Sequence, residues 1–400
     1  MSASYDIVVV GGGVTGLTVA ALLLQCECAP ALRVTLVDAA KRPAHAVDDD
    51  VALRVSAFAT GSAELLDSIG AWRHIADTRV SAYEQMRVWD EADTEDSPSA
   101  LRFDAAEFAV PQLGFIVENV LVQHALLEVL DGSGVELRFE SPMRSMRRVG
   151  RKFKLAFDDD TLDADLVVAA DGARSFVRKC AAIETESWPY EQDAFVTHLR
   201  PEQSHQNTAW QRFLRTGPLG MLPLSDGRIS VVWSVPTQLA EAATAASDEE
   251  LGEMLTDASG YVLGELVAEG PRGSFPLCAQ HAKNYVMPGL ALIGDAAHAV
   301  HPLAGQGANL GLQDAAELAN IISEAIASGM HPGDKPVLRR YERARKGANA
   351  TMLHFMTGLN RLFRADSMLL GEIRSTGMRL FNRSGPIRER AVKVALGVGR

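Results

Sequence analysis

The strongest constraint on the fold of this chain is a glycine-rich turn close to its N-terminus. Apolar Tyr5–Val10 predicts a short buried strand, and Val14–Leu24, which is apolar almost all round, predicts a buried helix. Between them, the segment Gly11-Gly12-Gly13-Val14-Thr15-Gly16 fits the pattern GxGxxG. A second apolar strand, Arg33–Val37, ends at Asp38. We therefore expect a βαβ unit that opens a parallel sheet.

Each position of this motif suits a dinucleotide. Gly11 permits the tight turn, Gly13 lets the backbone approach a pyrophosphate, and Gly16 lets the helix pack closely on the strand. The amide groups at the helix start, Val14-Thr15, face the phosphates, and Asp38 can accept a hydrogen bond from a ribose hydroxyl. A plain glycine turn is the alternative, but the surrounding strand, helix and acid favour a dinucleotide site.

Two later strands also end beside an acid and a glycine. Leu162–Ala170 predicts a strand followed by Asp171-Gly172, although an ordinary strand-to-helix turn explains that pair equally well. Leu290–Ile293 predicts another strand, which ends at Gly294-Asp295. Before a predicted helix at Gln313–Ser328 lies a patterned loop that contains His298, His301, Pro302, Gly305, Gln306, Gly307, Ala308, Asn309 and Gly311. Its glycines leave room for a flat ligand, and the positive end of the following helix favours negative charge there.

The middle of the chain has a different pattern. Ala209–Thr216, Leu219–Pro223 and Arg228–Val235 are strand-like and are joined by turn sequences, which predicts an antiparallel meander. The region Trp188–Pro276 is therefore expected to be a β-rich domain inserted into the nucleotide-binding fold. The segment Arg79–Phe108 is expected to join it.

Together, these blocks resemble the group A flavoprotein hydroxylases, the family of para-hydroxybenzoate hydroxylase. More closely, the chain resembles the ring hydroxylases of ubiquinone biosynthesis. The resemblance runs from Asp6 to the C-terminus, and its last block is highly specific. The residues that carry it are Arg54-Val55-Ser56-Ala57, Leu113–Asn119, Gly217–Leu224 and His301–Gly311.

The resemblance implies an FAD site built from these motifs. It places the FAD pyrophosphate on Gly11, Gly13 and Gly16. Asp38 stands where the family binds the adenosine ribose, and Arg54 matches an arginine that lies along the flavin.

Further along the chain, the resemblance adds contacts to the other parts of the cofactor. Asn119 matches a position where related hydroxylases place a polar side chain on FAD, and Asp171-Gly172 matches a segment linked to FAD and nicotinamide binding. Asp295, preceded by Gly294, matches the acid that binds the ribityl chain. The loop beside the isoalloxazine matches Pro302, Gly305, Gln306, Gly307, Ala308 and Asn309.

The activity that the resemblance implies is an aromatic monooxygenation. NADPH or NADH would reduce FAD, and O2 would form a flavin C4a-hydroperoxide that hydroxylates the ring of a polyprenylated phenol. Pro302, Gly305 and Gln306 would position the flavin. No general acid or base is assigned, because His298 and His301 are equally well explained as structural. No metal site is expected.

Three alternatives stay open at this point. The chain could be a flavin hydroxylase of a small soluble aromatic, or an FAD-dependent prenyl-lipid reductase of similar fold. It could also be an FAD-holding accessory subunit of a biosynthetic complex, with little turnover of its own.

The expected fold class is α/β, or α+β overall. A Rossmann-like FAD-binding domain would carry an inserted antiparallel β-sheet substrate domain and C-terminal helices. The FAD-binding domain would comprise 1–78, 109–187 and 277–350, the substrate domain 79–108 and 188–276, and the C-terminal helical region 351–400.

The substrate is expected between the flavin loop and the inserted sheet. Candidates for the apolar wall of that pocket are Phe213, Met221 and Val231. Ordinary sheet core is the alternative for each of the three residues.

The charge of the chain is unevenly spread. The formal net charge is −12, yet residues 339–400 carry 14 Lys and Arg against four acids. In this region Met352, Phe355, Met356, Leu359, Leu362 and Phe363 recur at helical spacing. An apolar stripe beside basic residues suits a helix lying on an anionic membrane, and packing onto the FAD domain or a second subunit is the alternative.

Cysteine spacing and hydropathy indicate the compartment. Cys26, Cys28, Cys180 and Cys278 form no CxxC pair and no metal-ligand set, which favours a reducing compartment. No signal peptide and no apolar run of about 18 residues is evident. We expect a cytoplasmic protein, with contact at the inner face of the membrane as a variant. Expected partners are the polyprenyl-phenol and other ubiquinone-biosynthesis proteins, and no nucleic acid.

Overall fold

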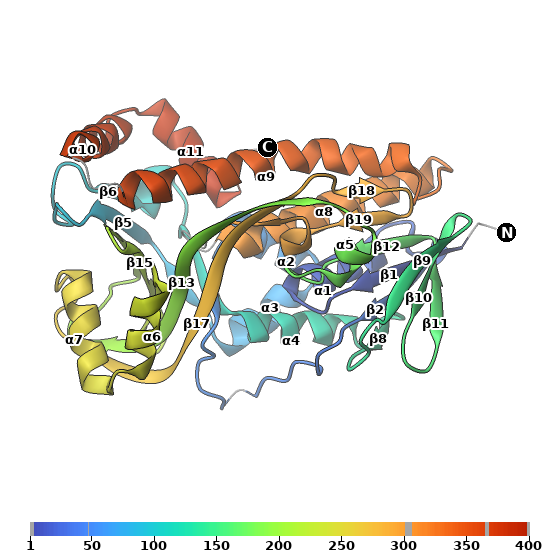
Figure 1. Cartoon of the computed structure of the whole chain (residues 1–400), viewed down its shortest axis with the longest axis horizontal. Coiled ribbons are helices and arrows are strands. Elements are labelled where there is room, and N and C mark those ends of the chain that lie inside the picture. The colour runs from blue at the N-terminus through green and yellow to red at the C-terminus, as the bar shows by residue number, and fades with distance from the viewer. Residues whose placement is uncertain (1–3, 47, 301–305, 365–367, 398–400) are drawn as a thin grey trace.

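The glycine-rich segment follows a central strand of a six-stranded sheet and leads into a helix, as the βαβ pattern predicted. The computed structural model describes residues 4–46, 48–300, 306–364 and 368–397. In this sheet the strand order is β18-β19-β12-β1-β2-β8, and every described pair except β18 with β19 is parallel (Figure 1). The strands are β1 (Tyr5–Val10), β2 (Leu32–Val37), β8 (Glu136–Arg138), β12 (Leu166–Ala169), β18 (Val286–Met287) and β19 (Leu290–Leu292).

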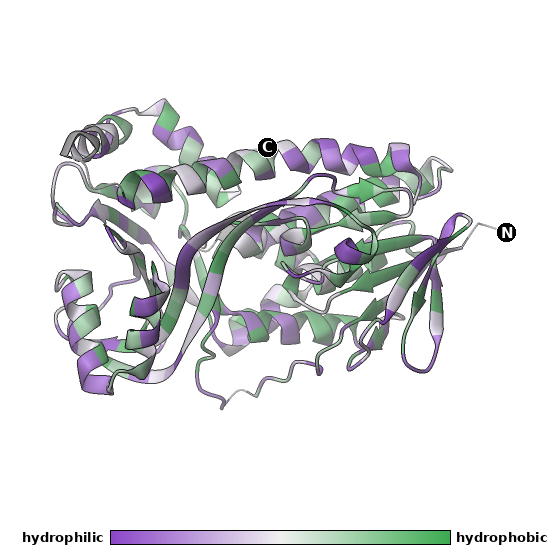
Figure 2. Ribbon diagram, in the orientation of Figure 1, coloured by the Kyte–Doolittle hydropathy of each residue, from purple (hydrophilic) through white to green (hydrophobic). Residues whose placement is uncertain are grey.

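The parallel strands are buried and almost wholly apolar. Helices α1 (Val14–Gln25), α4 (Asn119–Leu130) and α8 (Gln306–Ala327) pack together against them. Figure 2 shows these central strands and α1 as the most hydrophobic part of the ribbon. Such continuous apolar strands are typical of parallel sheets that are covered on both faces.

One predicted strand is wrong in its extent. The run Leu162–Ala170 forms two strands, β11 (Thr161–Ala164) and β12, which belong to different sheets. The chain changes sheet at Asp165, whose carboxylate accepts from the Asp6 N–H (2.9 Å) and pairs with Lys152 (3.0 Å). β11 then forms a small antiparallel sheet with β9 (Ser145–Val149) and β10 (Lys152–Ala156).

The predicted meander is part of an eight-stranded sheet with the order β20-β17-β13-β16-β15-β14-β5-β6. Its pairs are antiparallel except β14 with β5. Two of its strands, β5 and β6, come from the segment 79–108. The bounds are β5 (Gln85–Asp90), β6 (Leu101–Asp104), β13 (Thr185–Pro201), β14 (Thr208–Leu214), β15 (Gly217–Pro223), β16 (Ile229–Pro236), β17 (Leu266–Ala282) and β20 (His298–Ala299).

Two helices that the sequence analysis did not predict cover one face of this sheet. They are α6 (Thr237–Ala245) and α7 (Asp248–Ser259). A capping box between Ser247 and Glu250 starts α7, and the S-x-x-E spacing is a signal that could have found it.

The residues that face α6 and α7 include two of the expected pocket-wall residues. Met221 and Val231 are both fully buried in the cluster that contains the apolar side chains of α6 and α7. Phe213 lies in a different cluster, packed under the C-terminal helices. All three residues are therefore sheet core, and their assignment to the pocket wall is wrong.

The remaining elements connect the two large sheets. A three-stranded sheet has the order β3-β7-β4. Its strands are β3 (Val55–Ala59), β4 (Ser81–Tyr83) and β7 (Gly114–Glu118). The remaining short helices of the described chain are α2 (Thr60–Ser68), α3 (Ala71–Thr78), α5 (Phe176–Cys180) and the 3-10 turns η1 (Ala29–Ala31), η2 (Ala105–Phe108) and η3 (Gly294–Ala296).

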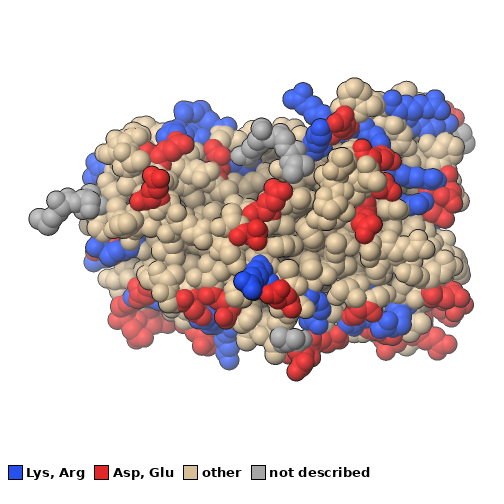
Figure 3. Space-filling model, turned by 180° about the vertical axis from the view of Figure 1, so that it is seen from behind, with Lys and Arg blue, Asp and Glu red and all other residues tan. Residues whose placement is uncertain are grey.

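The C-terminal stripe packs on the protein. Helix α9 (Lys335–Arg364) buries Met356 and Phe363 against β5 and β14, and the Phe363 ring stacks on Phe213 with centroids 3.9 Å apart. Only Phe355 of the stripe is strongly exposed, at 58%. The stripe thus packs on the protein, as the alternative expected, but on the eight-stranded sheet and not on the FAD-binding domain. Helices α10 (Met368–Asn382) and α11 (Pro386–Leu396) follow, and in the rear view Lys and Arg gather over this corner (Figure 3).

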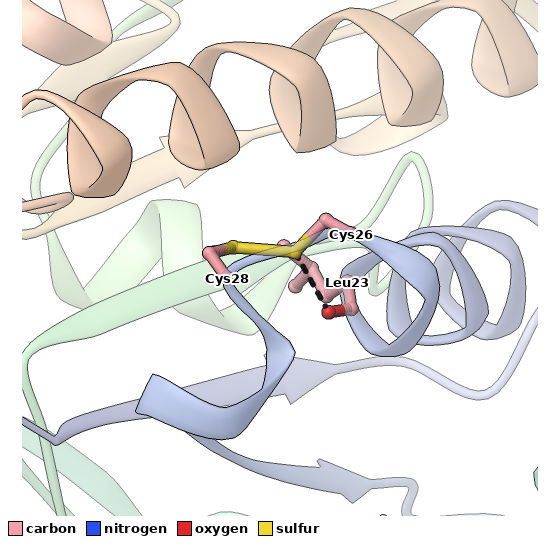
Figure 4. The surroundings of a disulfide bond; sticks show 3 residues. All are labelled: Leu23, Cys26 and Cys28. Atoms are coloured by element: carbon pink, nitrogen blue, oxygen red, sulfur yellow. Dashed lines mark hydrogen bonds between the residues drawn. A yellow bond between two sulfur atoms is a disulfide. The ribbon is translucent and has the colours of Figure 1, made fainter.

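Two of the four cysteines are paired. Cys26 and Cys28, just after α1, form a disulfide with their Cα atoms 5.2 Å apart (Figure 4). The Cys26 sulfur also lies 3.1 Å from the Leu23 carbonyl oxygen. The sequence analysis, which expected a reducing compartment from the cysteine spacing, did not predict this disulfide. Cys180 and Cys278 are free thiols.

No helix in the described ranges has the length and hydropathy needed to cross a membrane.

The stack between α9 and the sheet gives a prediction for stability. Phe363→Ala should lower the free energy of unfolding by about 3 kcal/mol, because it removes a buried ring and leaves a cavity. The matched control Phe355→Ala, which truncates an exposed ring on the same helix, should change it by about 0.5 kcal/mol or less. Chemical denaturation of both variants measures the difference. Equal effects of the two substitutions would contradict the packing of α9.

Candidate active site

Strand register brings the predicted motifs to one edge of the six-stranded sheet. Val10 is opposite both Val37 and Ala169, and Ala169 is opposite Leu292. The segments that follow these residues therefore leave the sheet side by side. They carry Gly11, Asp38, Asp171-Gly172 and Gly294-Asp295. Ligands bind at this carboxyl edge in open parallel sheets.

The three glycines of the first motif have different surroundings. Gly11 has φ +112°, and a Cβ there would collide with the Ala170 carbonyl. A Cβ on Gly16 would collide with the Gly11 carbonyl oxygen, so both glycines are required by close packing. A Cβ on Gly13 would meet no described atom within 4 Å. The open position therefore coincides with the one predicted to face a pyrophosphate.

Asp38 lies at the carboxyl edge of the sheet and also supports the glycine-rich turn by hydrogen bonds. Its carboxylate accepts from the Gly12 N–H (2.5 Å) and the Ala40 N–H (2.7 Å). The sequence analysis missed a second support: the Gln123 amide of α4 donates to the Gly12 carbonyl at 3.0 Å. No local sequence signal marks Gln123, because its bond to Gly12 joins residues 111 positions apart.

Arg54 and Asp295 form the charged part of the site. Arg54 is exposed, and its guanidinium lies over the Phe275 ring of β17 at 5.5 Å from the centroid. Asp295 is also exposed to solvent, yet protein atoms surround its carboxylate closely. This desolvation raises the pKa of Asp295, and the positive potentials of His298 and Arg54 offset it only in part.

Asn119 and Asn309 use their side chains within the protein. The Asn119 N–H donates to the Arg54 carbonyl (3.0 Å), and its side chain accepts from the Ser56 hydroxyl (2.7 Å). Buried Asn309 bridges to β3, because its amide donates to the Ala57 carbonyl (2.8 Å) and accepts from the Ala59 N–H (2.9 Å). Both asparagines therefore fix the segment that carries Arg54.

The Asp171 segment is tied to the Asp295 turn. One carboxylate oxygen of Asp171 accepts from the Val177 N–H at 3.0 Å, and the other is buried with no hydrogen-bond partner among the described residues. Gly172 has φ +77° and no described atom near its Cβ position. Arg178 of α5 donates to the Ala296 carbonyl at 2.7 Å and so joins the two segments.

The last motif is only partly described. His301, Pro302 and Gly305 lie outside the described residues, and of Gln306 only the backbone, at the start of α8, is described. A Cβ on Gly307 would meet no described atom, and Ala308 is half-buried.

Two other glycines of this block are needed for packing. A Cβ on Gly311 would collide with the Thr15 hydroxyl, and one on Gly294 would lie 3.1 Å from it. The expectation that Gly311 leaves room for a ligand is therefore wrong. Thr15 fills that space from α1.

The pKa of Asp295 predicts a stability effect with a definite sign. Because the folded chain raises this pKa, the ionised carboxylate costs stability above the ordinary Asp value of 3.8. Asp295→Asn should therefore raise the melting temperature of the FAD-free protein at pH 7, and the gain should shrink as the pH falls toward 4. The control Asp38→Asn should lower it, because that carboxylate accepts from two backbone N–H groups. A destabilised Asp295→Asn variant at pH 7 would contradict the argument.

Known proteins match this chain over nearly its whole length. The family model described as FAD binding domain matches residues 4–356. The 3-demethoxyubiquinol 3-hydroxylase of Escherichia coli is 34% identical, with 98% of both chains covered. The ubiquinone biosynthesis monooxygenase COQ6 of Mus musculus is 32% identical over 98% of this chain and 90% of its own. The ubiquinone hydroxylase UbiL of Rhodospirillum rubrum is 35% identical over 98% of this chain and 89% of its own.

Solved structures share the fold. The p-nitrophenol 4-monooxygenase PnpA of Pseudomonas putida has a TM-score of 0.78 at 18% identity, with both chains fully covered. PqsL of Pseudomonas aeruginosa, in complex with 2-aminobenzoylacetate, has a TM-score of 0.76 at 21% identity over 94% of this chain and 99% of its own. With this fold, and with relatives above 30% identity along its length, the chain belongs to the FAD-binding domain family of flavoprotein monooxygenases, in the group that contains the ubiquinone-biosynthesis hydroxylases.

Proposed function

We propose that this protein is an FAD-dependent monooxygenase that hydroxylates the aromatic ring of a polyprenylated phenol in ubiquinone biosynthesis. The main support is that one sheet edge gathers the Gly11–Gly16 turn, Asp38, Asp171-Gly172 and Gly294-Asp295, in a chain whose relatives are ubiquinone-biosynthesis hydroxylases. The cofactor is FAD, with NADPH or NADH as electron donor and O2 as co-substrate.

The residues at the edge fit FAD. A Cβ added to Gly13, Gly172 or Gly307 would meet no described atom within 4 Å. A closely bound cofactor requires such free space beside the backbone. The unpartnered buried oxygen of Asp171 also needs a donor that the described chain does not supply. In this proposal the Gly11–Gly16 turn and the start of α1 hold the pyrophosphate.

The other proposed contacts with FAD come from segments later in the sequence. Asp38 holds the adenosine ribose, Asp295 and Gly294 hold the ribityl chain, and Arg54 lies along the flavin. Asn119 acts by fixing the Arg54 segment. The loop positions that flank the isoalloxazine are Pro302, Gly305, Gln306, Gly307, Ala308 and Asn309.

The substrate wall follows from strand alternation. Met221 and Val231 point to α6 and α7, so their neighbours Gly220 and Val232 point to the opposite face of the sheet. These two residues are directly paired and half-buried, and a Cβ on Gly220 would meet only the Val232 carbonyl, at 3.7 Å. We place the aromatic ring over Gly220, where an apolar and open surface can exclude water from it.

Bound FAD supplies the redox chemistry: it takes electrons from the reduced nicotinamide and activates O2. The protein binds the ring, orients it and keeps water away. No side chain at the described edge is placed to act as a nucleophile, and none is needed for this reaction class.

The experiment that tests the proposal measures turnover with labelled oxygen. The purified protein should be yellow, and its NADPH or NADH oxidation should rise when a polyprenylated phenol is added. One atom of ¹⁸O from ¹⁸O2 should enter the product. Gly13→Leu is the control: it should fold, because the position is open, but lose FAD and this activity.

The three alternatives give different results in the same assay. Stimulation by small soluble phenols alone would indicate a soluble-aromatic hydroxylase. Stimulated oxidation without ¹⁸O in the product would indicate a reductase. No stimulation by any phenol would indicate an accessory subunit, and each of these results would overturn the proposal.

We further propose that the C-terminal helices contact the inner face of an anionic membrane, where a polyprenylated substrate resides. The support is the exposure of Leu380, Ile387 and Val394 on α10 and α11, at 64%, 68% and 60%. Arg383 and Arg390 lie close to them in the chain and form no ion pair in the described structure. Exposed apolar side chains among cations suit an interface with anionic lipid, where each cation contributes about 1 kcal/mol.

Vesicle sedimentation tests this contact. Binding should rise with the fraction of anionic lipid and fall with salt, and Ile387→Asp with Val394→Asp should weaken it about tenfold. The matched control is Val267→Asp on β17, whose side chain is exposed to a similar degree, 58%, but lies far from α10 and α11 in the sequence. Equal loss with the control, or equal binding to neutral vesicles, would overturn the proposal.

A further inference from the structure

The most completely buried charge near the site is the carboxylate of Asp314 on α8, which has no exposed surface. One of its oxygens accepts from the Gly294 N–H at 3.1 Å and faces His298 Nε2 at 2.5 Å. The other accepts from Arg345 Nε at 2.7 Å and from the Asn349 amide at 3.1 Å. Four donors, two from the Gly294–His298 segment and two from α9, therefore meet on one carboxylate.

This buried carboxylate would destabilise the fold if its only role were to fill the core. Burying a carboxylate costs several kcal/mol, and apolar residues of the same volume often stabilise a fold as well or better. A charge that is buried at this position therefore indicates a role other than core packing. The donors suggest that reason, because Gly294 and His298 are the two ends of the segment that contains Asp295.

The segment itself needs an external support. Gly294 has φ +56° and is wedged against Thr15, and the next residue, Asp295, is open to solvent. Among the described residues, the side chain of Asp295 forms no hydrogen bond that would fix its direction. The bonds of Asp314 to both ends are what hold the turn.

We propose that Asp314 is a positioning residue for FAD, which holds the Gly294–His298 turn so that Asp295 faces the ribityl chain. Arg345 and Asn349 complete the device from α9, since Arg345 also donates to the Asn349 side chain at 3.1 Å. This inference rests on the proposed role of Asp295. It adds that α9, which supplies none of the predicted FAD contacts, supports the flavin site from behind.

The charge state of Asp314 is well defined. Burial by itself would raise the pKa of Asp314, but the charges and hydrogen bonds of His298 and Arg345 together hold it below the ordinary value. The carboxylate is therefore ionised at any assay pH near neutrality. Asn in its place could accept at only one oxygen, and its NH2 group would face donors.

The experiment compares Asp314→Asn with Glu342→Gln. Glu342 is also a buried carboxylate, at 6% exposure, and also accepts from a backbone N–H, that of Tyr285 at 2.9 Å. It lies on α9, and its described hydrogen bond and ion pair go to Tyr285 and Arg339 and not to the Gly294–His298 turn. FAD affinity is measured by titrating each FAD-free variant with flavin, at a temperature where circular dichroism shows it folded.

Both variants should melt at lower temperature than the wild type, but only Asp314→Asn should lose FAD affinity. The expected rise in Kd is about tenfold to a hundredfold, the range seen when supporting hydrogen bonds behind metal ligands are removed. The near-UV and visible circular dichroism of bound flavin should also change. An unchanged Kd, or a loss of affinity shared equally by Glu342→Gln, would overturn the proposal.

A double variant separates this inference from the site assignment. If Asp314 acts through Asp295, then Asp295→Asn with Asp314→Asn should bind FAD no more weakly than the worse single variant. Additive losses would show that Asp314 acts elsewhere and overturn the inference. If Asp295→Asn alone leaves Kd unchanged, the proposed ribityl contact fails instead. Should Asp314→Asn not fold, Asn349→Ala removes one donor from the same device and should raise Kd in the same direction.

Discussion

The structure depends on the close approach of α1 to β1. Two glycines make it possible, because a side chain at Gly16 would collide with the Gly11 carbonyl. Once the helix lies that close, Thr15 fills the space beside Gly294 and Gly311 and so brings the turn after β19 and helix α8 against the same point. The edge of the sheet is thus assembled by contact between backbones, which leaves little freedom in where its motifs lie.

A second organising element is α9, whose 30 residues contact several parts of the molecule. Its first half supplies Arg345 and Asn349 to the buried carboxylate of Asp314, and its second half packs Met356 and Phe363 on the eight-stranded sheet. One rigid helix therefore joins the proposed cofactor site to the sheet that we propose for the substrate. The cations and exposed apolar residues that we assign to a membrane come immediately after it, on α10 and α11.

Much of the architecture could be predicted because its signals are local. Tyr5–Val10 is a strand with the predicted bounds, and the meander follows the turn sequences between β14, β15 and β16. The errors arose where tertiary contacts decide. Leu162–Ala170 is apolar throughout, and only the bonds of Asp165 divide it between two sheets. Met221 and Val231 have the pattern of a sheet face, but the pattern does not say which face α6 and α7 cover.

The sequence by itself determined the βαβ unit, the family and the positions of the motifs, because glycines, acids and apolar runs act through their own backbone and their near neighbours. Only the tertiary structure decided what those residues contact. It committed Asn309 to β3, placed Thr15 where Gly311 was expected to leave room, and buried Asp314 against the Gly294–His298 turn. A buried charge is satisfied by donors from distant segments, here separated by 16 to 35 residues, and no local pattern shows which donors will meet.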